Sequence, residues 1–243
     1  MGLSHRTLIS IVNHHQIGTI SMPIKQFEGS TFVAFLDISG FKELMKDGDR
    51  AWNALDVLYQ EGYNSIQASH GKVEGLFVSD SGILFTRNGD ALPAMLTNLL
   101  RVVQRLNRRM LGSNYMLTTS IAYGSFKFQE RIEFPGIDKN PIYGNAYVQA
   151  FSDNASGTPR IEPGFCRIVR ENLPGEITSN VGTPADQLLH LLAERRSDRR
   201  HLYFYWNLSH RADIEAFERE YTNAYSLKYS GMLKALKRGA NGV

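Results

Sequence analysis

Residues 31–41 read TFVAFLDISGF, and this stretch decides the fold. Its first six residues form a continuous apolar run, rich in β-branched and aromatic side chains, which is typical of a central strand covered on both faces. The run ends abruptly at Asp37, and Ser39 and Gly40 follow as a turn. A carboxylate at the end of a buried strand is costly unless it lies in water or binds a ligand. Asp37 is therefore the first candidate for a functional residue.

A second carboxylate is expected beside the first. Residues 71–86 have the pattern of a β-hairpin with the tip SDSG at 79–82, so Asp80 lies at that tip. If the strand over 31–36 lies beside this hairpin, Asp37 and Asp80 emerge at the same edge of the sheet. Two carboxylates, completed by triphosphate oxygens, are a usual way to hold Mg²⁺ or Mn²⁺. Either Asp alone is more often a helix cap or a turn residue, so the hypothesis depends on the pair.

The remaining pattern predicts an α+β fold. Because hairpins alternate with helical crossovers, one central mixed sheet flanked by helices is favoured. We expect a single domain with an N-terminal extension over 1–30, a main part over 31–175, and strand and helix elements over 176–243 that complete it. Helices are expected over 40–47, 50–68, 91–110, 144–154, 184–196 and 209–237, and further strands over 117–128, 164–169 and 202–206.

The composition excludes several classes of protein. The 243 residues are 42% hydrophobic and 21% charged, as in ordinary globular proteins, and the net charge of +3 is too small to argue for nucleic-acid binding. No apolar run approaches the roughly 20 residues that span a bilayer, and the N-terminus lacks the features of a signal peptide. Cys166 is the single cysteine, so we expect a cytoplasmic protein without disulfides.

Several segments resemble the catalytic domain of class III nucleotidyl cyclases, in the order that the family has. They are FLDISGF at 35–41, VSDSGILF at 78–85, SIAYG at 120–124 and IYG at 142–144. The resemblance implies a ferredoxin-like sheet flanked by helices and two bound metal ions, Mg²⁺ or Mn²⁺. Asp37, Asp80 and the backbone oxygen of Ile38 are the implied metal ligands. The turn of Ser39, Gly40 and Phe41, ahead of a helix N-terminus, is the expected phosphate-binding segment.

The departures from this family concern base recognition and catalysis. Where purine cyclases carry a Lys and an Asp that read the base, this chain has Leu76 and Pro141. The segments GNAY at 144–147 and TPRI at 158–161 resemble the bacterial Pycsar cyclases, which make cyclic UMP or cyclic CMP in antiphage defence. The transition-state Asn and Arg of the family fall at Val148 and Ser152, so Arg160 is the candidate for the catalytic cation.

The sequence therefore predicts an enzyme that closes UTP or CTP into the 3′,5′-cyclic monophosphate, with Asp37, Asp80 and Arg160 as catalytic residues. Class III sites form between two catalytic domains, so the resemblance also implies a homodimer with shared sites and a separate receptor for the product. Two other interpretations stay open: an inactive nucleotide-binding module, and a purine cyclase with rearranged base recognition. The helix over 209–237 can form dimer surface or fold onto its own sheet.

Overall fold

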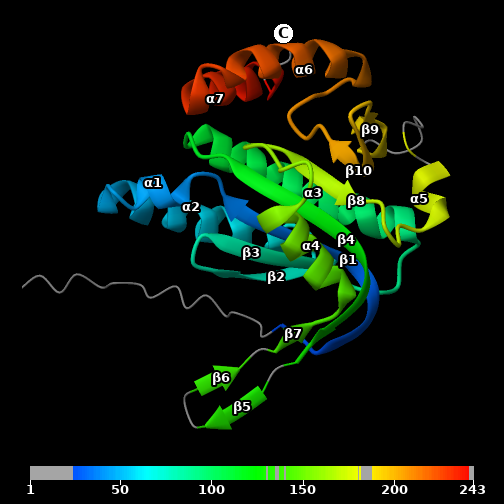
Figure 1. The fold of residues 1–243 in the computed structure, drawn as a ribbon. Coiled ribbons are helices and arrows are strands. Elements are labelled where there is room, and N and C mark those ends of the chain that lie inside the picture. Colours follow the sequence, from blue (N-terminus) through cyan, green and yellow to red (C-terminus); the bar gives the residue numbers. More distant parts are fainter. Residues whose placement is uncertain are drawn as a thin grey trace, which may run out of the picture.

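The apolar run before Asp37 forms the middle of a long strand, β1 (Phe27–Ile38), at the centre of a mixed sheet (Figure 1). The computed structural model describes residues 24–129, 131–134, 137–139, 141–179, 181 and 188–240. The strand order is β2-β3-β1-β4-β8-β10-β9, and β7 pairs with β4. All described pairings are antiparallel except that of β4 with β8, which is parallel. The other strands are β2 (Val73–Val78), β3 (Ser81–Thr86), β4 (Leu117–Phe128), β5 (Arg131–Phe134), β6 (Ile137–Lys139), β7 (Ile142–Tyr143), β8 (Cys166–Val169), β9 (Leu192–Arg195) and β10 (Asp198–Phe204).

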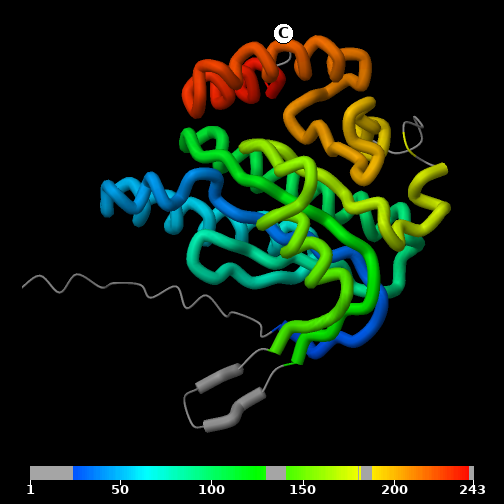
Figure 2. The backbone as a smooth tube through the Cα atoms, viewed as in Figure 1, coloured from blue at the N-terminus to red at the C-terminus, as the bar shows by residue number. Residues whose placement is uncertain are grey.

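Helices cover both faces of this sheet. On β1, Phe32 and Leu36 point into the main core with α2 and α3, whereas Phe35 points into a separate cluster with Ala150 of α4. Because both faces are buried, β1 is apolar at consecutive positions. Figure 2 shows β1 (blue) and β4 (green) side by side through the middle of the molecule. The helices are α1 (Phe41–Leu44), α2 (Gly48–Gln67), α3 (Leu92–Gly112), α4 (Asn145–Ser156), α5 (Gly175–Ser179), α6 (Ile214–Tyr225) and α7 (Lys228–Ala240), with short 3₁₀ helices η1 (Leu189–Leu191) and η2 (Arg211–Asp213).

A glycine turn places α4 against the sheet. Gly144 has a φ of 129°, a region that L side chains rarely adopt. A Cβ at this position would lie 2.2 Å from the carbonyl oxygen of Ser125, so only glycine permits this approach of backbone to backbone. The short strand β7 therefore turns directly into α4, which lies across β1 and β4 on the side of Phe35 and Asp37.

The predicted α+β fold is confirmed, as are the central strand, the hairpin and the helix over 91–110. The predicted helix over 184–196 is wrong in its described part. There the chain forms η1 and then β9, which extends the sheet through β10. The leucines at 188, 189, 191 and 192 are buried in a turn and a strand, and a short apolar run of this kind fits a strand as well as a helix.

The predicted single helix over 209–237 is also wrong, because the chain reverses within it. α6 ends at Tyr225, and Lys228 has a positive φ of 57° where α7 begins. The two helices pack against each other at Gly231, where a Cβ would lie 2.4 Å from the carbonyl oxygen of Ala224. Their apolar side chains, including Phe217 and Leu236, are buried in the main core. Of the two alternatives for this segment, folding onto the body of its own chain is the one observed.

Two further predictions concern the ends of the chain. β1 begins at Phe27, so its first four residues lie within the segment expected to be an N-terminal extension; residues 1–23 lie outside the described part. β9, β10, α6 and α7 all come from the segment over 176–243, and the two strands join the same sheet as β1. Among the described residues, none of the helices combines the length and apolar character that crossing a membrane requires.

Candidate active site

The end of β1 and the tip of the β2–β3 hairpin bring the two predicted carboxylates together. In the pairing of β1 with β3, Asp37 lies opposite Ser81. The backbone N–H of Ile38 donates a 3.0 Å hydrogen bond to the carbonyl oxygen of Asp80. Ser79, in the tight turn between the strands, has a positive φ of 54°. Asp80 is therefore adjacent to the residue that faces Asp37, and both carboxylates lie at one edge of the sheet.

The surroundings of Asp37 disfavour its charged form. Burial raises the pKa of the Asp37 carboxyl to about 6, and the negative charge of Asp80 adds to the rise. A hydrogen bond from Ser81 Oγ to Asp37 Oδ1, 2.9 Å long, acts in the opposite direction. A carboxylate held in a costly environment beside a like charge is typical of functional sites.

These residues fit a divalent cation. Within the described part of the chain, no lysine, arginine or histidine forms an ion pair with Asp37 or Asp80. The hydroxyl of Ser39 is buried at the same end of β1 and has no hydrogen-bond partner among the described residues. No cluster of three or more His, Cys, Asp or Glu side chains suited to a metal occurs in the described ranges. A cation held here needs further oxygen ligands, which a bound phosphate supplies.

A cavity of about 520 Å³ opens beside Asp37, a volume within the usual range for small-molecule pockets. Its wall combines charged side chains, hydroxyl groups and aromatic rings. Asp80 is not among its lining residues, whereas Arg160 is. The lining residues are Phe35, Asp37, Ser39, Gly40, Ser81, Thr118, Phe151, Asn154, Ala155, Arg160, Ile161, Glu162, Pro163 and Tyr225.

The predicted site residues divide between this cavity and the core. Ser39 and Gly40 line the cavity, and Gly40 has the left-handed φ of 76° that the turn into α1 requires. The ring of Phe41 is buried in the main core, so only the backbone of this residue is available to a ligand. The predicted helix over 40–47 is the single turn α1, and α2 follows at Gly48. The exposed Arg160 lies in the segment between α4 and β8, on the wall of the cavity that contains Asp37.

The positions that depart from the cyclase pattern are apolar or exposed. Leu76 packs against the cluster formed by Val33 and Phe85, so it offers no polar group to a base. Val148 and Ser152 lie on the outer face of α4 and are exposed.

A cluster of buried charged side chains beneath α4 was not predicted from the sequence. Arg167 of β8 is fully buried and forms a two-pronged ion pair with Asp153, in which Nε and Nη2 each lie 2.8 Å from a carboxylate oxygen. Its Nη1 donates to the carbonyl oxygen of Pro159, 2.6 Å away. His201 bridges Asp153 and Asp198, with nitrogen–oxygen distances of 2.8 and 2.7 Å. The available signal was an arginine inside the apolar strand CRIV at 166–169.

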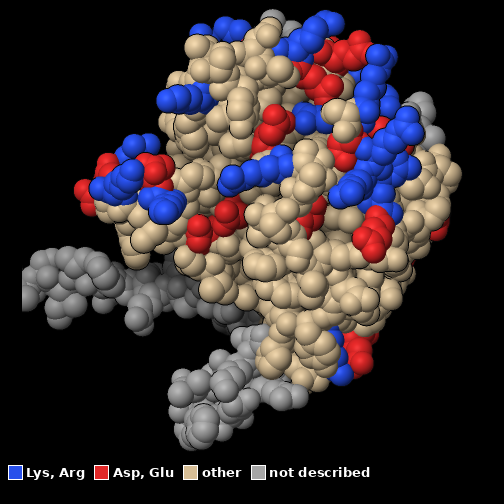
Figure 3. All heavy atoms as spheres, in the orientation of Figure 1, with Lys and Arg blue, Asp and Glu red and all other residues tan. Residues whose placement is uncertain are grey.

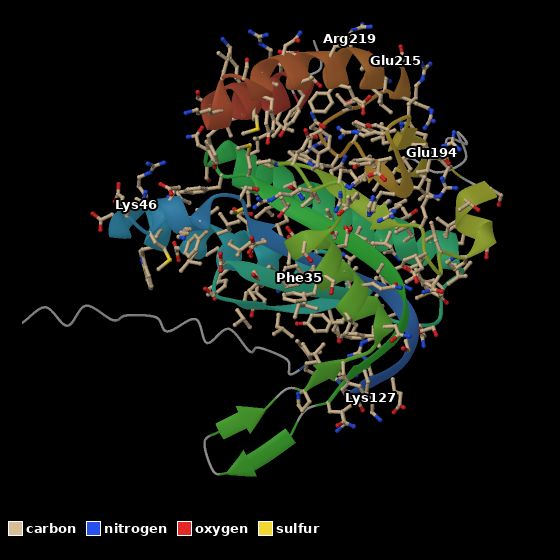
Figure 4. The ribbon with its side chains drawn as sticks, viewed as in Figure 1. Phe35, Lys46, Lys127, Glu194, Glu215 and Arg219 are labelled. Carbon is tan, nitrogen blue, oxygen red and sulfur yellow. The ribbon has the colours of Figure 1, made fainter. Side chains whose placement is uncertain are left out.

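A larger cavity, about 980 Å³, lies between the β9–β10 hairpin and α6. Figure 3 shows basic and acidic side chains mixed over these elements, and Figure 4 labels Glu194, Glu215 and Arg219 there. Arg195 in its wall already pairs with Glu162 and Glu218, at 3.0 and 2.7 Å. None of the predicted site residues lines this cavity. The candidate active site is therefore the smaller cavity, where Figure 4 shows Phe35 beside α4.

No protein-family model matches this sequence, and no curated protein matches it as a relative. Solved structures do match. The guanylate cyclase domain of RhGC from Catenaria anguillulae in complex with GTP has a TM-score of 0.53 at 11% identity and covers 74% of this chain and 96% of its own. The guanylyl cyclase Cya2 has a TM-score of 0.52 at 9% identity, covering 74% and 92%. The adenylyl cyclase CyaB from P. aeruginosa has a TM-score of 0.50 at 15% identity, covering 74% and 94%. The chain thus has the fold of class III guanylyl and adenylyl cyclase catalytic domains.

Proposed function

We propose that this protein is a metal-dependent pyrimidine nucleotide cyclase, which converts UTP or CTP to the 3′,5′-cyclic monophosphate and pyrophosphate. The observation that supports it most is the pair of neighbouring carboxylates, Asp37 and Asp80, without a cationic partner among the described residues. Asp37 of this pair lines a cavity that Arg160 also lines. Two features favour catalysis over passive binding. The chain shares its fold with nucleotide cyclases, and it has acidic residues at both positions that bind metal in the family that the sequence resembles.

The proposed reaction is an intramolecular displacement at the α-phosphorus. The ribose 3′-oxygen loses its proton to solvent water and forms the new bond to the α-phosphorus, while the bond between the α-phosphorus and the bridging oxygen of the β-phosphate breaks and pyrophosphate leaves. Asp37, Asp80 and the carbonyl of Ile38 would hold Mg²⁺ or Mn²⁺. When bound, these ions supply the positive charge that acidifies the 3′-hydroxyl and neutralises the leaving group. The remaining task of the protein is to position the substrate and stabilise charge, which we assign to Arg160 and to the backbone of Ser39, Gly40 and Phe41.

The pyrimidine preference rests on two positions. Leu76 and Pro141 replace the polar residues that read a purine in the family that the sequence resembles. Leu76 packs in an apolar cluster, and the carbonyl oxygen of Pro141 accepts a hydrogen bond from Gln129 N, 3.1 Å away. The likeness to Pycsar cyclases supports a role for the product as an antiphage second messenger, read by a separate receptor.

The first test is to incubate the purified protein with ATP, GTP, CTP or UTP and with Mg²⁺ or Mn²⁺, and to identify products by mass spectrometry. We expect cyclic UMP or cyclic CMP. Asp37→Asn and Asp80→Asn should each lower turnover by roughly a hundredfold or more, because each removes one negative charge from the metal site. Asp56→Asn, on the exposed side of α2, is the matched control and should leave turnover unchanged. Full activity in either site variant would contradict the proposal.

An inactive nucleotide-binding module is the second candidate, and the exposed Val148 and Ser152 at the transition-state positions favour it. The same experiment separates the two functions when nucleotide binding is measured in parallel by calorimetry. Binding of a pyrimidine triphosphate without any cyclic product would support the module. Cyclic AMP or cyclic GMP as the main product would retain the cyclase and overturn the pyrimidine preference.

A further inference from the structure

One aromatic residue of α6 breaks the burial pattern of its helix. Ile214, Phe217 and Tyr221 follow one another at helical spacing and are all buried in the main core. Tyr225 is the next residue of the same stripe, yet 51% of it is exposed. It contributes to the wall of the cavity that contains Asp37. The stripe that anchors α6 thus ends with a ring that borders the candidate active site.

A second ring borders the same cavity from another element. Phe151 of α4 is 44% exposed. Its ring meets that of Phe35 edge-on, with the centroids 5.1 Å apart and the planes at 87°. The cavity therefore has aromatic rings from α4 and α6 as well as the charged groups of Asp37 and Arg160.

The position of α6 relative to this cavity is fixed by a hydrogen bond. The hydroxyl of Tyr221, one turn before Tyr225, donates to the carbonyl oxygen of Pro163 at 2.6 Å, and Pro163 lines the cavity too. The Tyr221 ring also packs edge-on against Phe165, with the centroids 4.7 Å apart. Because its helix is anchored in this way, the ring of Tyr225 is held near the cavity before any ligand arrives, which lowers the entropic cost of binding.

We infer that Tyr225 is a substrate-contacting residue, whose ring stacks on the nucleobase of a nucleoside triphosphate bound in the protomer that also supplies Asp37. This inference rests on the proposed function and adds a residue from the C-terminal helices to the site. A nucleoside triphosphate combines a flat aromatic ring with a polyanion, which matches rings beside an arginine and a metal-binding carboxylate. Stacking tolerates any base because every base has a π face, so Tyr225 contributes affinity and the base edges are read elsewhere.

The test measures binding without turnover. The probes are 3′-deoxyuridine and 3′-deoxycytidine triphosphate with Mg²⁺, which lack the attacking hydroxyl and cannot be cyclised. In calorimetric titrations Tyr225→Ala should weaken binding about five- to hundredfold, whereas Tyr225→Phe keeps the ring and should stay within about threefold of the unaltered protein. Tyr63→Ala is the matched control, because Tyr63 is 52% exposed but lies on α2 and does not line the cavity. Inorganic triphosphate as the probe should bind equally to the unaltered protein and to Tyr225→Ala.

The outcomes separate this inference from the proposed function. If the unaltered protein binds neither probe, the nucleotide site and the inference fail together. If it binds a probe and Tyr225→Ala binds it equally well, the inference alone is overturned. Equal weakening of nucleotide and inorganic triphosphate by Tyr225→Ala would also overturn stacking, because a ring that contacts only the base has no effect on the phosphates. Melting temperatures of the variants verify that each is folded.

A mixing experiment tests whether Tyr225 and Asp37 act within one protomer. Asp37→Asn and Tyr225→Ala chains are co-expressed with different tags, and the mixed dimer is isolated and assayed at low substrate concentration. If both residues serve one protomer's site, neither site of the mixed dimer is complete and activity stays at the level of the single variants. If the ring came from the partner, one site would be intact and about half of the unaltered activity would return, which would overturn the assignment.

Discussion

At the residue scale, Asp37 shows a conflict between stability and binding. The strand β1, which ends one residue after Asp37, has apolar side chains on both faces, and the carboxylate interrupts that pattern beside a second carboxylate. Burial raises the pKa of Asp37 to about 6, and the charge of Asp80 raises it further against the hydrogen bond from Ser81. Ionisation of Asp37, which a cation requires, is therefore less favourable in the metal-free protein than in a free aspartate side chain.

This conflict predicts how Asp37→Asn changes stability with pH. Because the folded-state pKa exceeds the unfolded value of 3.8, the folded protein binds the extra proton, and the free energy of unfolding falls as pH rises from about 4 to about 6. A neutral asparagine avoids that loss. In urea titrations with EDTA, Asp37→Asn should be more stable than the unaltered protein at pH 7.5 by about 1 kcal/mol, after allowance for solvent screening, and equal to it near pH 4.

Divalent cations should reverse this order. Binding of Mn²⁺ at the carboxylate should raise the unfolding midpoint of the unaltered protein, whereas Asp37→Asn should gain little. The same titrations with millimolar Mn²⁺ give the comparison. If Asp37→Asn were less stable than the unaltered protein in EDTA at pH 7.5, the unfavourable effect of the Asp37 carboxylate on stability would be contradicted. An equal gain of both proteins from Mn²⁺ would place the cation elsewhere.

At the element scale, the ion pair of Arg167 and Asp153 joins β8 to the C-terminal end of α4. Arg167→Ala would leave the carboxylate of Asp153 buried, with His201 and Ser120 as its remaining side-chain partners among the described residues. Losing one member of a buried pair typically costs about 3–5 kcal/mol, so we expect a loss of that size in urea unfolding. Replacing both members by apolar residues, as in Arg167→Met with Asp153→Leu, should cost less than the single change. Arg199→Ala is the control, because Arg199 is exposed on β10. If Arg167→Ala lowered the free energy of unfolding by less than about 1 kcal/mol, the ion pair would be dispensable for stability.

The same scale shows why some elements could be predicted from the sequence and others could not. β1 and the β2–β3 hairpin are specified locally, by a continuous apolar run and by a polar turn between two short strands. η1 and β9 are specified by long-range contacts, because the leucines that suggested a helix are buried by β10 and the main core. The reversal between α6 and α7 depends on Gly231, whose close contact with Ala224 exists only after the helices pack.

The candidate site divides in the same way. Asp37 and Asp80 were predictable because each lies at the end of a strand or turn that its own neighbours define. Arg160 was predicted as the catalytic cation because the arginine position implied by the family resemblance falls at Ser152, and the structure places Arg160 on the wall of the same cavity. Tyr225 lies 225 − 37 = 188 residues from Asp37 in the sequence, and no local pattern predicts that α6 returns to this cavity. The position of Arg167 beneath α4 depends equally on the parallel pairing of β4 with β8.

At the scale of the whole molecule, the outer face of α4 carries exposed apolar side chains among its polar ones, where a helix usually presents polar residues to water. Val148 is 54% exposed, and Phe151 and Tyr143 are exposed close to it in the sequence. This face borders the candidate active site through Phe151, so a second protomer seated on it would approach the cavity. We expect the homodimer that the sequence resemblance implies to form through this face.

The corresponding prediction concerns mass and activity together. At micromolar concentration, light scattering should give the mass of a dimer, because a partner protomer would cover the exposed apolar side chains on α4. Val148→Lys buries a charge in that contact, which should weaken the dimer at least about tenfold and lower turnover in parallel at dilute protein concentration. Trp52→Lys changes an apolar side chain on α2 that is even more exposed, at 73%, and should leave both mass and turnover as they are. A dimer that survives Val148→Lys but dissociates in Trp52→Lys would place the interface on α2. An active monomer would contradict the shared site, because Asp37, Arg160 and Tyr225 of one chain would then be sufficient for turnover.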